Sequence, residues 1–337
     1  MKSLMSVPES AVEYLSGQIE RIRSLRPPKK IVFPEGSDKR ILEAAGRLAK
    51  EGILQPVVLG SASPPLAGVQ FIDPPHSPLV NKYASLLRDR RSAKGMTAWE
   101  AAEAVQHPLY FANLMVAAGD ADGCVASAAH TTAESVRAAL HCVEMKLGFR
   151  RLSSVHIMAV PDRAFGQQGL VAFSDAAINP DPSPVELSEI AIATAENTRA
   201  ILNAEPQVAL LSFSTKGSAR HRHVTKVVEA LRYIRARAPE LQVDGELQAD
   251  AALVPAVAQA KAPVSPLAGR ANTLIFPDLN SANIGYKLVE RLAGGALLAV
   301  VLQGLARPTN IVSRGCSAED VYHTAILTAV QAARAGR

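Results

Sequence analysis

The feature that most constrains the fold is an alternation of strand-like and helix-like segments early in the chain. Residues 31–33 (Ile-Val-Phe) and 56–60 (Pro-Val-Val-Leu-Gly) have the composition of buried strands, and between them Ile41, Ala44 and Leu48 recur at helical spacing. Two strands joined by a helix predict a parallel pair with a right-handed crossover. We therefore expect an α/β fold.

Length and composition narrow the class of protein. A chain of 337 residues can form two domains, and 48% hydrophobic with 20% charged residues is typical of a soluble globular protein. Only 4% of the residues are aromatic and the net charge is +5, without a concentrated basic tract. This pattern argues against a nucleic-acid partner and suits small anionic substrates.

The cysteines and the apolar runs indicate the compartment. Cys124, Cys142 and Cys316 show no paired spacing, so neither a disulfide framework nor a cysteine-based zinc site is expected. We find no signal-peptide pattern and no apolar run of about 18 residues, so we expect no membrane span. The sequence predicts a cytoplasmic protein.

A polar loop near the C-terminus is the strongest candidate for a functional site. A strand-like run at 297–302 precedes it, a helix-like run at 321–333 follows it, and it contains Ser313, Arg314 and Asp320. A loop that enters a helix N-terminus binds anions readily, and such loops line the ligand crevice of open α/β sheets. The same residues have a simpler explanation, since Ser317 and Asp320 have the spacing of a capping box. By themselves the residues favour capping over catalysis.

The order of these residues resembles a known family. Gln303-Gly304-Leu305, Pro308, Asn310 and the run from Ser313 to Asp320 resemble the C-terminal signature of the phosphate acetyltransferase (phosphotransacetylase) family. Other runs similar to that family occur from Ile31 to Ala332, among them Pro-Glu-Gly-x-x-x-Arg at 34–40. The resemblance therefore covers nearly the whole chain.

The resemblance implies an architecture of two doubly wound α/β domains of the isocitrate and isopropylmalate dehydrogenase-like type, with the active cleft between them. Domain I would comprise residues 1–148 plus 303–337, and domain II residues 149–302. Domain II would be inserted into domain I and would form the contact of a homodimer.

The resemblance also implies a reaction, acetyl-CoA plus phosphate giving CoA plus acetyl phosphate, reversibly. Asp320 would be the base for the CoA thiol, Ser313 would stabilise the tetrahedral oxyanion, and Arg314 would hold the acyl phosphate. Arg91 and Arg137 match the family's anion-binding arginines, Arg91 on the CoA phosphate side. Coenzyme A would be a substrate, with no tightly bound cofactor and no metal.

Further substrate contacts are expected in other segments. Ser214, Lys216 and Ser218 follow a strand-like run at 208–213, and we expect them to open a helix. A helix start would make them an anion site, although they lack the Walker A spacing. By the resemblance we add Thr132, Asn283, Gln303 and Asn310 to the substrate-binding residues.

Two other clusters have open or structural interpretations. The acidic residues Asp244, Glu246 and Asp250 fit either a divalent metal site or a capped turn after a strand. We interpret His221 and His223 as surface residues at a helix start.

The sequence departs from the family pattern in three places: Ala299-Val300, Ile311 and Ala176. They leave alternatives open. The nearest is a phosphate butyryl- or propionyltransferase. Another is a metal- and NAD(P)-dependent hydroxy-acid dehydrogenase of the same fold. A third, suggested by the apolar Ile311, is a non-catalytic paralogue that binds CoA or acyl phosphate.

Overall fold

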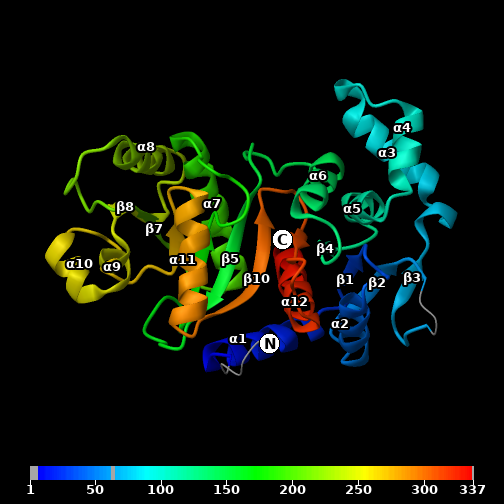
Figure 1. Cartoon of the computed structure of the whole chain (residues 1–337), viewed down its shortest axis with the longest axis horizontal. Helices are drawn as coiled ribbons and strands as arrows, with labels where there is room; N and C mark the ends of the chain where they lie inside the picture. The colour runs from blue at the N-terminus through cyan, green and yellow to red at the C-terminus, as the bar shows by residue number, and fades with distance from the viewer. Residues whose placement is uncertain (1–6, 62–64, 336–337) are drawn as a thin grey trace. The chain divides into compact units, whose positions relative to one another are not determined.

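The computed structural model describes residues 7–61 and 65–335, and the chain divides into two compact units (Figure 1). The first unit comprises residues 15–148 and 305–337, and the second unit residues 1–14 and 149–304. The helix α1 (Glu9–Arg23) carries the chain from the second unit into the first. The domain bounds expected from the family resemblance stay a prediction.

The first unit contains a parallel sheet with strand order β3-β2-β1-β4-β11. The strands are β1 (Lys30–Phe33), β2 (Gln55–Leu59), β3 (Gln70–Ile72), β4 (Gly123–Ala126) and β11 (Thr309–Ile311). The helices are α2 (Lys39–Lys50), α3 (Val80–Arg91), α4 (Ala98–Val105), α5 (Pro108–Ala118), α6 (Thr132–Cys142) and α12 (Ala318–Ala335), with short 3₁₀ turns at Pro74–His76 and Ser92–Lys94. The predicted parallel pair of the first two strands is confirmed.

Helices cover both faces of this sheet because successive side chains of a strand point to opposite sides. On β1, Ile31 and Phe33 pack with α2 and α12 in one core, whereas Val32 packs with α3 to α6 in another. Val125 and Cys124 on β4 divide in the same way. These strands are apolar on both sides, as expected of a doubly wound sheet.

The second unit contains a mixed sheet with strand order β10-β5-β6-β9-β7-β8. The β10–β5 and β5–β6 pairs are antiparallel and the others parallel. The strands are β5 (Ser153–Ala159), β6 (Leu170–Ser174), β7 (Gln207–Leu211), β8 (Gln242–Leu247), β9 (Thr273–Ile275) and β10 (Ala296–Gln303). The helices are α7 (Pro184–Ile201), α8 (Arg222–Arg237), α9 (Ala249–Leu253), α10 (Pro255–Lys261) and α11 (Leu279–Leu292).

The sheet of the second unit is also apolar on both faces. Leu210 and Val208 on β7 pack with α7 and α8, whereas Ala209 and Leu211 pack toward α9 and α11. Among the described residues no helix is both long and apolar enough to cross a membrane.

Local signals identified several elements correctly. Thr97 and Ser183 cap α4 and α7 in complete capping boxes, and the strand pair β5–β6 forms as expected. Three expectations were wrong. The loop at 214–218 does not open a helix, because α8 begins only at Arg222 with His221 as its N-cap. Asp244 and Glu246 lie inside β8 rather than after it. The polar C-terminal loop contains a strand, β11.

One buried histidine in the second unit makes stability depend on pH. His156 on β5 is 3% exposed, its Nδ1 has no hydrogen-bond partner among the described residues, and its ring lies 4.7 Å from that of Tyr286. Burial, and then the nearby Lys287, lower the pKa of His156 from 6.5 to about 3. The unfolded chain therefore binds one more proton than the folded chain between these values.

We expect the free energy of unfolding to fall as the pH drops below 6.5, with His156 contributing up to about 1.4 kcal/mol per pH unit. His156→Phe should reduce this slope in urea titrations performed between pH 7 and pH 4. Met158→Leu, a buried apolar change two residues away, is the matched control and should leave the slope as it is. An identical slope in wild type and His156→Phe would contradict the assignment.

Candidate active site

The predicted catalytic loop lies in the first unit, between β11 and α12. Val312 donates its N–H to Ala126 of β4 (2.9 Å), which extends the strand pairing by one residue. The chain then turns, with Cys316 N–H bonded to the Ser313 carbonyl (2.9 Å). Ser313 and Arg314 are exposed, whereas Cys316 is buried. The hydroxyl and the guanidinium therefore face solvent on an anchored loop.

Asp320 caps the helix that follows. The Ser317 N–H donates to Asp320 Oδ2 (2.7 Å), and the Asp320 N–H donates to Ser317 Oγ (3.2 Å). The capping explanation of these residues is thus confirmed. A catalytic role is compatible with it, because a carboxylate has two oxygens with several lone pairs.

The side chain of Arg40 on α2 binds main-chain carbonyls of the predicted catalytic loop. Its Nη1 donates to the carbonyls of Arg314 (2.7 Å) and Cys316 (2.9 Å), and its Nη2 donates to the carbonyl of Ala128 (2.7 Å). The same guanidinium binds both oxygens of Asp38, the N-cap of α2, at 3.0 and 2.6 Å. One planar group therefore fixes two segments that are far apart in sequence.

Arg40 and Asp38 also stabilise each other's charged form. Hydrogen bonding to Arg40 lowers the pKa of the Asp38 carboxyl, and hydrogen bonding to Asp38 raises the pKa of Arg40. Both groups stay ionised at neutral pH. We infer that Arg40 positions the loop, because its donors are already bound to protein oxygens.

Glu35 fixes the loop between β4 and α6. Its side chain is 1% exposed and accepts hydrogen bonds from the backbone N–H groups of Ala128 (2.8 Å), Ala129 (2.9 Å) and His130 (2.9 Å). The His130 ring nitrogen Nδ1 lies 2.8 Å from the same carboxylate. Glu35 therefore shapes the entry to α6.

Replacing Glu35 with Gln should loosen this loop, because an amide presents only one acceptor oxygen to these N–H groups. We expect a loss of about 2–4 kcal/mol in the free energy of unfolding. Hydrogen exchange should become faster at the amides of Ala129 and His130. Glu43→Gln, an exposed change on α2, is the control. Unchanged exchange at both amides would show that Glu35 does not hold the loop.

The first unit also has a basic patch, defined by Arg91, Lys94 and Arg137. Arg91 ends α3, Lys94 lies in the following turn, and Arg137 lies on α6. Burial first, then these three cations, lower the pKa of His141, whose Nδ1 lies 2.8 Å from the Tyr110 hydroxyl. The three cations therefore lie near enough to His141 to affect its charge.

Two further observations define this patch. Arg91 Nε is buried and has no hydrogen-bond partner among the described residues. Thr132, another predicted contact, is exposed as the first residue of α6, next to its N-cap Thr131. The patch thus consists of side-chain cations at the end of α3, in the following turn and on α6.

The predicted anion site of the second unit is occupied by protein groups. The loop at 214–218 bonds to β8 and to the residue that follows it, with Gly217 N–H donating to Glu246 Oε1 (2.7 Å) and Ala219 N–H to Ser214 Oγ (3.1 Å). Ser218 Oγ accepts from the Thr215 N–H (2.9 Å), and Lys216 Nζ binds Asp244 Oδ1 (2.5 Å). Substrate binding by Ser214, Lys216 and Ser218 stays a prediction.

Three of the residues predicted to bind substrate have side-chain amides that donate to neighbouring protein groups. Gln303 is 1% exposed and donates to Ser153 Oγ (2.9 Å) and Thr194 Oγ1 (2.8 Å) in the second unit. Asn310, buried in β11, donates to Thr328 Oγ1 (2.9 Å), and Asn283 on α11 donates to the Ala176 carbonyl (3.3 Å). These contacts hold the protein itself together, and a substrate role for these residues stays a prediction.

The acidic cluster around Asp244 and the pair His221 and His223 remain to be compared with the structure. Over residues 7–61 and 65–335 no group of three His, Cys, Asp or Glu side chains is arranged to hold a metal ion. His221 and His223 are exposed at the start of α8, as expected. Ile311 is buried in β11 at 4% exposure, so its apolar side chain belongs to the packing of the sheet.

Comparisons with known proteins identify the family of the chain. The family model described as "Phosphate acetyl/butaryl transferase" matches residues 16–329. A phosphate acetyltransferase of Thermoanaerobacterium thermosaccharolyticum is 45% identical over 93% of this chain and 98% of its own. One of Acetivibrio thermocellus is 42% identical over 95% and 98%. The crystal structure of a phosphotransacetylase from Streptococcus pyogenes is 41% identical, with a TM-score of 0.89 over 96% of this chain and 99% of that one.

The fold and these relationships define an acyltransferase built on doubly wound α/β domains. The chain belongs to the phosphate acetyl/butyryl transferase family.

Sequence reasoning missed the two residues that hold the site together, Arg40 and Glu35. Both lie in the Pro-Glu-Gly-x-x-x-Arg run that resembles the family, and this run was the available signal. Nothing in it indicates that its side chains reach loops about 90 and 270 residues away.

Proposed function

We propose that this protein is a phosphate acetyltransferase that transfers an acetyl group reversibly between CoA and inorganic phosphate. The observation that supports it most is the exposed Ser313–Arg314 pair on a loop anchored by Arg40 beside the N-terminus of α12. The relatives that share 42–45% identity are named for this activity. They favour the acetyl group over the butyryl or propionyl alternative.

In the proposed mechanism the two substrates react directly in a ternary complex. Asp320 accepts the proton of the CoA thiol as the sulfur attacks the carbonyl carbon of acetyl phosphate. The carbonyl oxygen becomes an oxyanion, to which the Ser313 hydroxyl donates a hydrogen bond. The C–O bond to phosphate then breaks, giving acetyl-CoA and inorganic phosphate held by the planar guanidinium of Arg314.

The basic patch has a role in the same proposal. Arg91, Lys94 and Arg137 would neutralise phosphate groups of CoA. CoA acts here as a substrate, and the mechanism uses no tightly bound cofactor and no metal. We further propose that the protein is cytoplasmic and forms a homodimer through residues 149–302.

The test is acyl-CoA formation by purified protein with CoA and acetyl, propionyl or butyryl phosphate. We expect the highest kcat/KM with acetyl phosphate. Faster turnover of butyryl phosphate would identify the protein as a phosphate butyryltransferase. CoA binding without turnover of any acyl phosphate would identify a non-catalytic paralogue, and NAD(P)-dependent oxidation of a hydroxy acid would identify the dehydrogenase alternative.

A further inference from the structure

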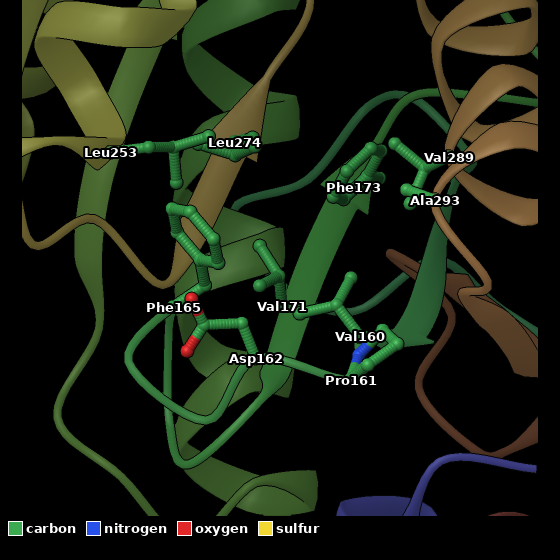
Figure 2. A pocket seen from close by; sticks show the side chains of 10 residues that line it. All are labelled: Val160, Pro161, Asp162, Phe165, Val171, Phe173, Leu253, Leu274, Val289 and Ala293. Carbon is green, nitrogen blue, oxygen red and sulfur yellow. The ribbon is translucent and has the colours of Figure 1, made fainter.

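The second unit contains a cavity of about 330 Å³ that the proposed reaction does not use (Figure 2). Ten residues line it, and all of them are apolar except Asp162. All ten belong to residues 149–304, so the cavity is a property of the second unit alone.

The shape of the cavity follows from how the sheet is covered. Its floor is formed by Val171 and Phe173 of β6 and by Leu274 of β9, all three buried. The helix α9 ends at Leu253 on one side, and α11 contributes Val289 on the other. Figure 2 shows Phe165 and Leu253 facing Val289 and Ala293 across Val171. The helix α9 is five residues long, and the cavity lies beside its last residue, Leu253.

Such a space favours an apolar ligand. A water molecule needs two to four polar partners, and these walls provide almost none. A volume of about 330 Å³ lies at the small end of the range of ligand pockets, which are mostly apolar with a few polar groups that orient the ligand.

Asp162 is the polar residue of the lining. Its Oδ1 accepts the Ala164 N–H (2.9 Å), and the side chain is exposed. The neighbouring Arg163 donates from Nη1 and Nη2 to the two carboxylate oxygens of Glu13, at 3.0 and 2.8 Å. In the described part of the chain no lysine or arginine forms an ion pair with Asp162, so its negative charge is open to an ammonium group.

We propose that this cavity is a binding site for a small apolar amine, with the hydrocarbon part on β6 and β9 and the ammonium group at Asp162. The site is separate from the residues of the proposed acetyl transfer. Its occupancy can therefore be measured as binding, whatever the outcome of the activity assay.

The probes are n-hexylamine, 1-hexanol and hexanoate, titrated into the full chain and followed by ligand-observed NMR. We expect saturable binding with the amine tightest and hexanoate weakest. Asp162→Asn should weaken binding of the amine roughly two- to fivefold, the effect of an exposed ion pair, and leave 1-hexanol unchanged.

Filling the cavity provides the second test. Val289→Phe should abolish binding of all three probes, whereas Leu288→Phe, the adjacent exposed position on α11, should preserve it. Ala293→Phe fills the same space from an exposed rim position and serves if Val289→Phe does not fold. Binding that survives in a filled variant would overturn the proposal. A wild type that binds no probe would overturn it too. If that wild type is a dimer and the filled variants are monomers, a second copy of the chain covers the cavity.

Discussion

Replacing Asp320 with Asn is expected to lower kcat for acetyl-CoA formation by about two to four orders of magnitude, because the amide cannot accept the thiol proton. The fold should remain. The Asn side-chain oxygen can still accept the Ser317 N–H that Asp320 Oδ2 accepts at 2.7 Å. Loss of the negative charge at the helix N-terminus should change the melting temperature by no more than about 4 °C.

Two control variants separate catalysis from capping. Ser317→Ala removes the other half of the same capping box and should cost about 1 kcal/mol of stability, with far less loss of kcat. Glu100→Gln makes the equivalent change in the capping box of α4, where Thr97 N–H donates to Glu100 Oε2 (2.7 Å), and should leave kcat as it is. If Asp320→Asn and Ser317→Ala lowered kcat equally, Asp320 would be a capping residue only.

Replacing Arg40 with Lys is expected to lower kcat about 10- to 100-fold, because a misplaced catalytic loop loses the geometry that the reaction needs. A lysine keeps the charge but cannot bind three carbonyls and both oxygens of Asp38 at once. The carbonyls of the buried residues Cys316 and Ala128, left without these donors, should cost about 2–3 kcal/mol of stability. The measurements are steady-state kinetics and urea unfolding.

The kinetic pattern distinguishes a positioning residue from one that binds substrate. Because Arg40 bonds to protein oxygens, kcat should fall by a larger factor than the KM for CoA rises. Arg47→Lys is the matched control on α2, since Arg47 pairs with side chains of Glu51 (2.9 Å) and Glu319 (2.5 Å) and not with the loop backbone. An increase in the KM for CoA with an unchanged kcat would show that Arg40 binds CoA instead.

Local sequence signals sufficed wherever the forces are local. The apolar spacing of α2 and the capping residues Thr97 and Ser183 act within a few residues of chain, and each predicted element formed. The predictions were wrong where a residue far away in the sequence determines the local structure. β11 is only three residues long, and it is a strand because it pairs with β4. The loop at 214–218 resembles a helix start, yet Glu246 on β8 accepts its hydrogen bonds.

The sequence by itself determined the fold class and the candidate residues Ser313, Arg314 and Asp320, because side-chain periodicity and motif order are properties of the chain. Only the tertiary structure decided what surrounds them. It showed that Arg40 and Glu35 hold the two loops of the site, and that Gln303 and Asn310 are buried. The physical reason is that a hydrogen bond depends on distances between atoms, and packing brings together residues whose separation in sequence gives no sign of it.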